Sequence, residues 1–209
     1  MLRSESESRA FVAARCSQEA LERLDLFAAR LREANATQNL VARSSLDCLW
    51  LRHIADSAQL LAHVSRETSL WLDLGSGAGF PGLIVAAMQP DRKIVMIESR
   101  ILRIQWLESM IRSLGLEKCR VIGKDIRRVD AFEADVISAR AFAPLPRLVE
   151  LSARFSTNAT EWVLPKGRSA AQDIAALPAH LRTRFHVKQS CTHSEAGIIV
   201  ARGHMEMSV

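Results

Sequence analysis

The chain has 209 residues, which is enough for one domain and a small extension. Its composition, 48% hydrophobic and 24% charged, supports a proper core and excludes an intrinsically disordered chain. The net charge of +5 arises after residue 72: residues 73–209 carry nineteen basic and fourteen acidic side chains, whereas residues 1–72 carry nine of each. A basic excess favours a polyanionic partner, although a solvated basic surface explains it equally well.

Targeting and redox features indicate a protein of the cytoplasm. No apolar run approaches the roughly 20 residues that cross a bilayer, so no membrane partner is expected. Residues 1–8 lack the apolar stretch of a secretory signal, and we expect a solvated, frayed tail. The four cysteines are far apart and lack metal-ligand spacing, so we expect reduced thiols and no metal, with a disulfide as the less favoured alternative. They are Cys16, Cys48, Cys119 and Cys191.

Residues 1–68 have helical periodicity, and we expect them to form an N-terminal helical extension packed on the core. Ser17 is predicted to cap a helix that Asn35 would end. Its apolar positions are spaced by three and four residues: Leu21, Leu24, Ala28 and Leu31. A second helix is predicted from Ser45 to about Val64.

Residues 69–209 alternate strands and helices, and we assign them to a second, larger domain. Strands are predicted at 69–74, 93–98, 119–123, 134–138 and 161–164. Helices are predicted at 82–88, 101–114 and 145–155, with a short one after Gly167. Segments 184–188 and 197–202 have no helix between them and predict an antiparallel edge hairpin. The pattern therefore predicts an α/β, Rossmann-like fold with a seven-stranded, mostly parallel sheet.

A glycine loop follows the first predicted strand and opens the next helix. Gly75, Gly77 and Gly79 let the backbone turn tightly and approach a ligand. Dinucleotide loops have the spacing G-x-G-x-x-G, whereas here the spacing is G-x-G-x-G, with Asp73 two places before the first glycine. Asp73 would repel a diphosphate but would suit the ammonium of S-adenosylmethionine. The loop therefore favours S-adenosylmethionine over a nicotinamide cofactor.

Acidic residues end the next two strands. Glu98 lies 23 residues after Gly75, where a carboxylate accepts hydrogen bonds from ribose hydroxyls. Asp125 follows the third strand, where the adenine edge is expected. Either acid alone is explained equally well as an exposed strand end, but the combination with Asp73 in this register favours a cofactor site.

These segments resemble the RsmG (GidB) family, bacterial methyltransferases of small-subunit ribosomal RNA. The resemblance runs from about Asn39 to the C-terminus. It rests on the following segments: Asn39-Leu-Val-Ala; Arg52-His-Ile-Ala-Asp-Ser; the loop Gly75 to Gly82 with its Phe-Pro-Gly ending; Glu98-Ser99 with Arg103; Arg140-Ala-Phe-Ala; and Leu164-Pro-Lys-Gly. The resemblance implies a class I methyltransferase domain at 69–209, S-adenosylmethionine as the cofactor, and methylation of N7 of guanine 527 in 16S rRNA.

The resemblance also implies site residues. It places cofactor contacts at Gly75, Phe80, the neighbourhood of Ile126 and Arg127, and Arg140. Leu102-Arg103 stands where the family commonly has Lys-Arg, and Ile126-Arg127 stands where it commonly has a residue pair ending in Glu.

The chemistry assigns further candidates. Guanine N7 has a lone pair and no proton, so direct methyl transfer needs no general base. Arg140 follows a buried strand at the ligand-binding end of the sheet, and Arg140, Phe80 and Phe142 are candidates for holding an unstacked base, although Phe142 fits the core equally well. His53 and Asp56 are expected to support the catalytic site with Arg140, and a packed helix histidine is the alternative for His53. Candidates for gripping RNA phosphates are Arg52, Arg103, Lys166 and Arg168.

Three other functions stay open at this point. One is a methyltransferase of a small molecule or a protein, and another is a non-catalytic RNA-binding module. A nicotinamide oxidoreductase is the third. A monomer is expected, because nothing in the sequence demands a dimer.

Overall fold

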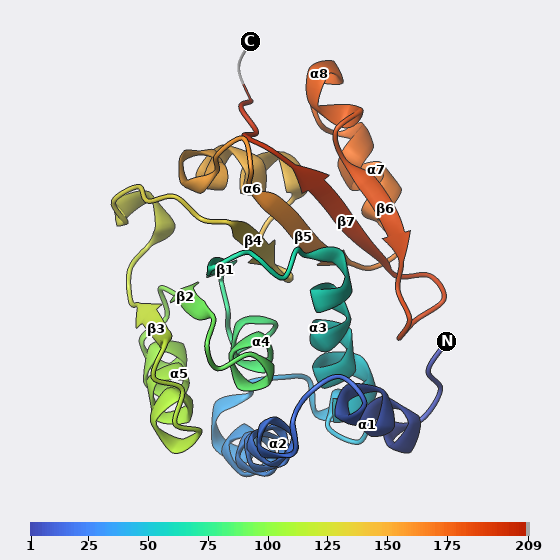
Figure 1. Ribbon diagram of the computed structural model, residues 1–209, viewed down its shortest axis with the longest axis vertical. Coiled ribbons are helices and arrows are strands. Elements are labelled where there is room, and N and C mark those ends of the chain that lie inside the picture. Colours follow the sequence, from blue (N-terminus) through green and yellow to red (C-terminus); the bar gives the residue numbers. More distant parts are fainter. Residues whose placement is uncertain (208–209) are drawn as a thin grey trace.

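The protein, as described over residues 1–207 of a computed structural model, is built on one seven-stranded sheet of order β3-β2-β1-β4-β5-β7-β6 (Figure 1). The strands are β1 (Leu70–Leu74), β2 (Lys93–Ile97), β3 (Cys119–Ile122), β4 (Val136–Ala139), β5 (Glu161–Lys166), β6 (His186–Gln189) and β7 (Gly197–Arg202). The first five are parallel, whereas β7 is antiparallel to both β5 and β6. The predicted fold class is therefore confirmed. Residues 208–209 of the predicted second domain lie outside the described residues.

Helices cover both faces of this sheet. The α-helices are α1 (Glu5–Ala13), α2 (Gln18–Gln38), α3 (Asp56–Ala58), α4 (Gly82–Met88), α5 (Ile101–Ser113), α6 (Leu145–Ser152), α7 (Ala170–Ala175) and α8 (Ala179–Arg182). The shorter turns are η1 (Arg43–Ser45), the π-helical η2 (Trp50–Ala55), η3 (Gln59–His63), η4 (Ile126–Arg128) and η5 (Ala153–Phe155). Figure 1 shows α1, α2 and α4 on one side of the sheet and α6 on the other.

Alternate strand residues supply two cores. Trp71 of β1 belongs to the core under α2 and α4, whereas its neighbour Leu72 belongs to the core under α6 and α7. This is the two-residue period of a strand that is buried on both faces. The sheet is thus sandwiched, and its carboxyl-end edge is left to build a site.

The N-terminus differs from the prediction. Residues 5–13 form a helix, not a frayed tail, because the Ser4 hydroxyl caps it and Glu5 reaches another segment. The Glu5 carboxylate accepts hydrogen bonds from the amides of Trp50 (2.9 Å) and Leu51 (2.8 Å). The tail is therefore ordered by a long-range contact that sequence periodicity does not show.

The first predicted helix has the expected start and a later end. Ser17 caps α2, as predicted, and its hydroxyl accepts a hydrogen bond from the amide of Ala20. The predicted end at Asn35 is wrong, since α2 continues to Gln38 and Asn39 adopts the left-handed conformation (φ 45°). Asn35 is instead buried, and its side-chain oxygen accepts a hydrogen bond from the amide of Val41.

The predicted helix from Ser45 to Val64 is broken into η1, η2, α3 and η3. The π-helical turn η2 begins where Glu5 caps the chain, and it carries His53. Single π-helical turns often occur at functional sites.

The N-terminal residues share a core with the sheet. Phe27 and Leu31 of α2 belong to the same buried cluster as Leu83 and Ile84 of α4. The division into units 1–68 and 69–209 remains a prediction. Over the described residues, no helix has the length and apolar character needed to cross a membrane.

Candidate active site

A cleft of about 510 Å³ lies at the carboxyl ends of β1, β2, β3 and β4. β1 lies between β2 and β4, so the strand order runs to β2 and β3 on one side of β1 and to β4 and β5 on the other. In open α/β sheets, ligands bind at the point where the strand order reverses in this way. The predicted residues that line the cleft are Gly75, Gly77, Phe80, Glu98, Arg103, Asp125, Ile126, Arg127, Arg140 and Phe142. Those lying outside its lining are Arg52, His53, Asp56, Asp73, Gly79, Lys166 and Arg168.

The glycine loop turns with positive φ angles that favour glycine. Gly75 and Gly77 have φ values of +64° and +56°, and Gly79 has a φ of +106°. A Cβ on Gly75 would meet Cδ2 of Phe142 at 2.5 Å, and a Cβ on Gly79 would meet Leu83 at 2.4 Å. The loop backbone therefore leaves no room for a side chain at Gly75 or Gly79, because Phe142 and Leu83 approach these positions closely.

Asp73 lies beneath this loop and is fully buried. Its carboxylate accepts hydrogen bonds from the amide of Gly82 (3.2 Å) and from the Ser138 hydroxyl (2.7 Å). Burial raises the pKa of Asp73 to about 6, and these hydrogen bonds oppose that rise. Asp73 thus joins β1, β4 and the start of α4, and it shapes the loop from below.

Glu98 lies in the cleft and binds the loop directly. Its Oε2 accepts the Gly77 amide at 3.0 Å, and its Oε1 accepts the amides of Ser99 (2.7 Å) and Arg100 (2.9 Å). Each carboxylate oxygen has two acceptor sites, so the side chain retains capacity for a hydroxyl donor.

Asp125 is paired with Arg127. Its Oδ2 lies 2.6 Å from Nη2 of Arg127, and its Oδ1 accepts hydrogen bonds from the amide and Nε of the same residue. These hydrogen bonds hold the pKa of Asp125 well below its usual range. The Arg127 guanidinium therefore offsets the negative charge of Asp125.

The Phe80 ring is enclosed by other side chains. His53 stacks on it with centroids 4.9 Å apart, Phe27 meets it edge-on at 5.4 Å, and the guanidinium carbon of Arg140 lies 4.7 Å from its centroid. Phe80 is therefore a support for Arg140. Phe142 is half-buried at the cleft and is the more accessible ring.

His53 is held as a neutral imidazole. Its Nε2 lies 2.8 Å from the Ser45 hydroxyl, which donates to the Ala42 carbonyl and so accepts from Nε2. Nδ1 is buried, and no residue within 1–207 donates to it. Burial, together with the charges of Arg140 and Arg52, lowers the pKa of His53 to about 3.

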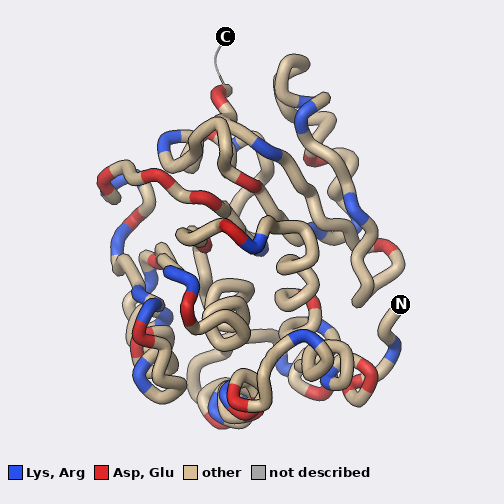
Figure 2. The backbone as a smooth tube through the Cα atoms, viewed as in Figure 1, with Lys and Arg blue, Asp and Glu red and all other residues tan. Residues whose placement is uncertain are grey.

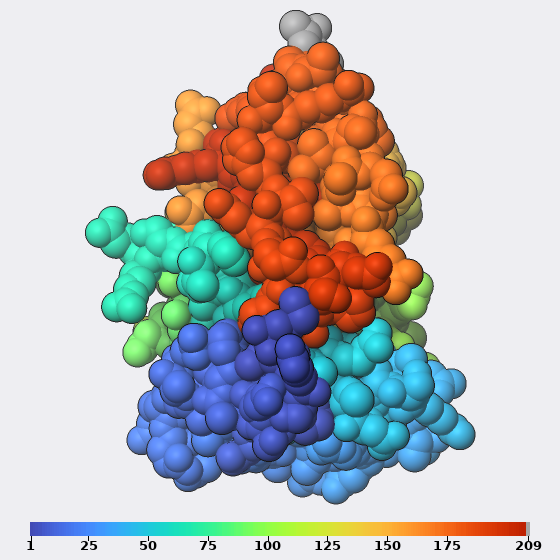
Figure 3. All heavy atoms as spheres, turned by 90° about the vertical axis from the view of Figure 1, so that its right-hand side faces the viewer, coloured from blue at the N-terminus to red at the C-terminus, as the bar shows by residue number. Residues whose placement is uncertain are grey.

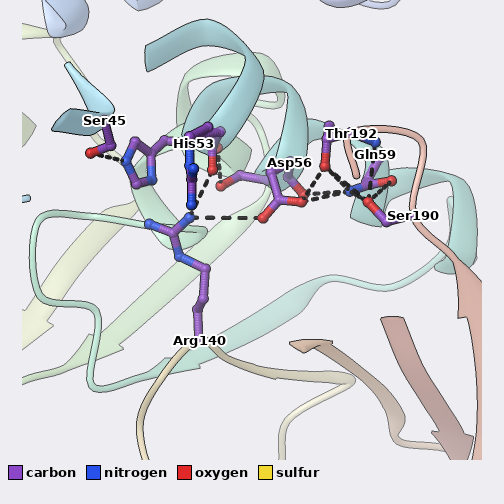
Figure 4. A network of polar contacts seen from close by, with 9 residues as sticks. Ser45, His53, Asp56, Gln59, Arg140, Ser190 and Thr192 are labelled. Carbon is purple, nitrogen blue, oxygen red and sulfur yellow. Dashed lines mark hydrogen bonds and ion pairs between the residues drawn. The ribbon is translucent and has the colours of Figure 1, made fainter. Parts of the chain in front are cut away.

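Arg140 faces the Asp56 carboxylate. Nη1 of Arg140 lies 3.8 Å from Oδ2 of Asp56 and 3.4 Å from the Arg52 carbonyl oxygen (Figure 4). Burial raises the pKa of Asp56, whereas hydrogen bonds and the charge of Arg140 oppose this rise. The structure thus places Asp56 beside Arg140, and both Arg140 and His53 against the Phe80 ring.

The predicted RNA-binding residues differ in their exposure and in the partners that they already have. Arg52 and Arg168 are exposed, although Arg168 lies 2.6 Å from Glu195. Arg103 donates to the Asn39 carbonyl at 2.6 Å and lines the cleft. Lys166 is largely buried between Asp173 (3.4 Å) and the Ala143 carbonyl (3.4 Å), so it anchors the segment after Arg140.

Sequence reasoning missed several contributors. Leu40 and Val41, from the loop after α2, line the cleft, and Trp106 of α5 donates to the Ala78 carbonyl at 2.9 Å. Ser138 links Asp73 to the indole of Trp71. The signals in the sequence were the apolar Leu40 and Val41 between the two predicted helices, and the resemblance carried by Asn39-Leu-Val-Ala.

The cleft is basic. Six Lys or Arg residues line it: Arg100, Arg103, Lys124, Arg127, Arg140 and Arg147. The two acids, Glu98 and Asp125, already accept the hydrogen bonds described above. Several of these basic positions follow β2 and β3 or lie on α5 (Figure 2). Among residues 1–207, no group of three or more His, Cys, Asp or Glu side chains is placed to hold a metal ion.

Comparisons with known proteins agree with this geometry. The chain is 57% identical over 203 residues to the ribosomal RNA small subunit methyltransferase G of Erythrobacter litoralis, covering 97% of this chain and 98% of that protein. Among solved structures, it resembles a precorrin-6y C5,15-methyltransferase from Geobacter metallireducens (TM-score 0.56, 12% identity, 80% and 92% of the two chains). It also resembles M. jannaschii TYW2 in complex with AdoMet (TM-score 0.55, 14% identity, 75% and 76%).

The sequence identity to the two solved structures is low, so this likeness shows the fold alone. The GidB family model, described as rRNA small subunit methyltransferase G, matches residues 20–201 and so begins before the segments that carry the resemblance in the sequence. The prediction of a methyltransferase that uses S-adenosylmethionine agrees with this match and is confirmed at the level of the family. The chain therefore belongs to the GidB family of ribosomal RNA small subunit methyltransferases.

Proposed function

We propose that this enzyme methylates N7 of guanine 527 in 16S rRNA of the small ribosomal subunit, using S-adenosylmethionine. The observation that carries the proposal is the basic lining of the cleft beside the glycine loop. S-adenosylmethionine has one net positive charge, so six basic side chains exceed what the cofactor requires. They suit the phosphates of a nucleic acid.

The cleft residues fit the cofactor. Gly75 and Gly77 present bare backbone, Glu98 retains one acceptor site for a ribose hydroxyl, and Ile126 lies where an adenine ring would pack. Asp73 lies too deep for direct contact, and we assign to it the shaping of the loop. When bound, S-adenosylmethionine supplies a methyl group carried on a sulfonium.

The chemistry at guanine requires no proton removal, because N7 carries a lone pair and no hydrogen. The site agrees with this requirement. Glu98 is bound by three amides, Asp125 is paired with Arg127, and His53 lies behind Phe80. The enzyme's task is then alignment, which supplies up to roughly 7–11 kcal/mol of a barrier.

Arg140 and Phe142 are assigned to hold the unstacked base. Both line the cleft at the end of β4, and the intervening Ala141 has a φ of +53°, which turns the chain sharply between them. Guanidinium and aromatic faces stack on bases. His53 and Asp56 support Arg140, while Arg52, Arg103 and Arg168 contact phosphates and Lys166 anchors the segment.

The test uses 30S subunits from a strain that lacks this methylation, with nucleoside mass spectrometry and mapping of the modified position. We expect one N7-methylguanosine per subunit, at position 527. Arg140→Ala is expected to lower turnover about 100-fold, whereas Arg112→Ala, an exposed arginine at the far end of α5, retains it. Methyl transfer only to a protein or a small molecule, or methylation at another guanine atom, would overturn the proposal.

A substrate of this kind also implies a cytoplasmic enzyme, and we propose that it acts as a monomer. Light scattering of the purified protein, alone and mixed with ribosomal subunits, tests whether the protein is a monomer in both conditions.

A further inference from the structure

We propose that Gln59, Ser190 and Thr192 are positioning residues for methyl transfer, which hold the Asp56 carboxylate so that it orients Arg140 at the cleft. This inference rests on the proposed role of Arg140. None of these three residues is among those that line the cleft in the described part of the chain, so their effect passes through Asp56.

The two oxygens of Asp56 have different partners. Oδ2 faces Arg140 at 3.8 Å, while Oδ1 accepts hydrogen bonds from the Thr192 hydroxyl (2.7 Å) and from Nε2 of Gln59 (2.9 Å) (Figure 4). Two neutral donors therefore fix the carboxylate from the side opposite the arginine. At 3.8 Å, Arg140 and Asp56 are too far apart for a close hydrogen bond. The position of the Asp56 carboxylate relative to Arg140 therefore depends on the donors that hold its other oxygen.

The hydrogen bonds around Gln59 have one consistent direction. Asp56 can only accept, so the Gln59 amide nitrogen must face it. The Gln59 oxygen then accepts the Cys191 amide at 2.8 Å. Ser190 accepts from the Thr192 amide at 3.1 Å and lies 2.9 Å from the Thr192 hydroxyl. Gln59, Ser190 and Thr192 are all buried, and a satisfied buried network of this kind is rigid.

The network joins segments that are distant in sequence. Gln59 begins η3, next to α3, whereas Ser190 and Thr192 belong to the hairpin loop after β6, more than 130 residues later. The N-terminus closes over the same loop, because the Leu2 amide donates to the Cys191 carbonyl at 2.8 Å. Figure 3 shows the dark blue N-terminal segment against this orange-red loop. An edge hairpin far from the cofactor loop thereby acts on the active-site arginine.

Loss of these donors has a defined electrostatic consequence. Burial raises the pKa of Asp56, and the hydrogen bonds from Thr192 and Gln59 and the charges of Arg140 and Arg52 lower it. The other titratable group that faces it is the Cys191 thiol from the hairpin loop, and His53, which is neutral, lies on the preceding element η2. Removing a donor therefore favours the protonated acid, which no longer attracts Arg140.

The test compares Thr192→Val with Thr192→Ser and with Thr160→Val. Thr160 is also fully buried, and its hydroxyl donates to the Ala134 carbonyl just before β4 and β5, so it controls for a lost buried hydroxyl. We expect Thr192→Val to lower kcat about tenfold, to leave cofactor affinity within twofold, and to move the acid limb of the kcat profile to higher pH. Thr192→Ser should restore both properties, and Thr160→Val should change neither.

A second readout separates this inference from the proposed function. The Nε–H signal of Arg140 in ¹⁵N NMR, identified by its loss in Arg140→Lys, should shift and exchange faster in Thr192→Val, whether or not rRNA is the substrate. Unchanged kcat, pH profile and Arg140 signal would overturn the inference. If Thr192→Val does not fold, Ser190→Ala is measured in the same way. Failure of the wild type to methylate rRNA would overturn the proposed function alone.

Discussion

A glycine at the site can be required by its backbone conformation, by crowding from neighbouring side chains, or by both. Gly75 and Gly115 have nearly equal φ values of +64° and +62°, yet a Cβ on Gly75 would meet Phe142 and one on Gly115 would meet nothing within 4 Å. Substitutions at these two positions therefore distinguish the effect of backbone strain, which both share, from the effect of crowding in the cleft, which only Gly75 has.

We predict that Gly75→Ala and Gly115→Ala each lower the free energy of unfolding by about 1–2 kcal/mol, because both force alanine into the left-handed region. Only Gly75→Ala should weaken S-adenosylmethionine binding, by about tenfold or more, since Phe142 must move. Thermal unfolding and titration calorimetry measure the two effects. Equal cofactor affinity in both variants would contradict the placement of Phe142.

His53 predicts a pH dependence of stability. The unfolded chain takes up a proton at His53 near pH 6.5, whereas the folded chain does so only near pH 3, so acid favours unfolding in this range. His53 should therefore make the protein about 2 kcal/mol less stable at pH 5 than at pH 7.

The measurement is the change in unfolding free energy between pH 7 and pH 5, in the wild type and in His53→Gln. Asp73 and Asp56 have raised pKa values and act with the opposite sign, but they are present in both proteins. The difference between the two proteins isolates His53. An equal pH dependence would show that His53 is protonated normally.

At the scale of elements, α1 supports the active site from outside it. Its residue Glu5 caps η2 at Trp50 and Leu51, and η2 carries His53 one turn before Asp56. A helix that the sequence shows only as a charged tail therefore fixes the segment behind Arg140.

We predict that Glu5→Ala lowers the free energy of unfolding by about 1.5–3 kcal/mol, since it removes two hydrogen bonds to a charged group. The methylation rate should fall as well, because η2 loses its cap. Glu7→Ala is the matched control. Glu7 is exposed in the same turn, and among residues 1–207 its carboxylate accepts a hydrogen bond from the Arg3 amide alone, so its loss should cost less than about 0.5 kcal/mol. A similar decrease in the free energy of unfolding of both variants would show that the contact of Glu5 with η2 does not stabilise the protein.

The elements also show where prediction from sequence succeeds. The strands and the helices α4 and α5 were predicted within a few residues, because their apolar periods and flanking glycines are local signals. The failures were α1, the end of α2 and the break at 45–64. The failure at α1 depends on a contact across the fold, that of Glu5 with η2, whereas the other two involve side-chain contacts within a few residues that periodicity does not encode, those of Asn35 with Val41 and of His53 with Ser45.

At the scale of the whole molecule, one core joins the N-terminal helices to the sheet. We predict a single cooperative unfolding transition in calorimetry, with equal calorimetric and van't Hoff enthalpies. S-adenosylmethionine at 100 times its Kd should raise the free energy of unfolding by about 2.7 kcal/mol and shift the whole transition. Two transitions, of which only the later one responds to the cofactor, would instead support a separable unit at residues 1–68.

The sequence by itself determined the α/β architecture, the glycine loop and the strand-end acid Glu98, because each depends on residues close together in the chain. It also carried the family resemblance. Only the tertiary structure decided that Asp73 lies under the loop, that Arg127 pairs with Asp125 and that Lys166 anchors its neighbours. The linkage from Thr192 through Asp56 to Arg140 likewise depends on folding, since side chains 136 residues apart meet only when the hairpin loop after β6 reaches α3.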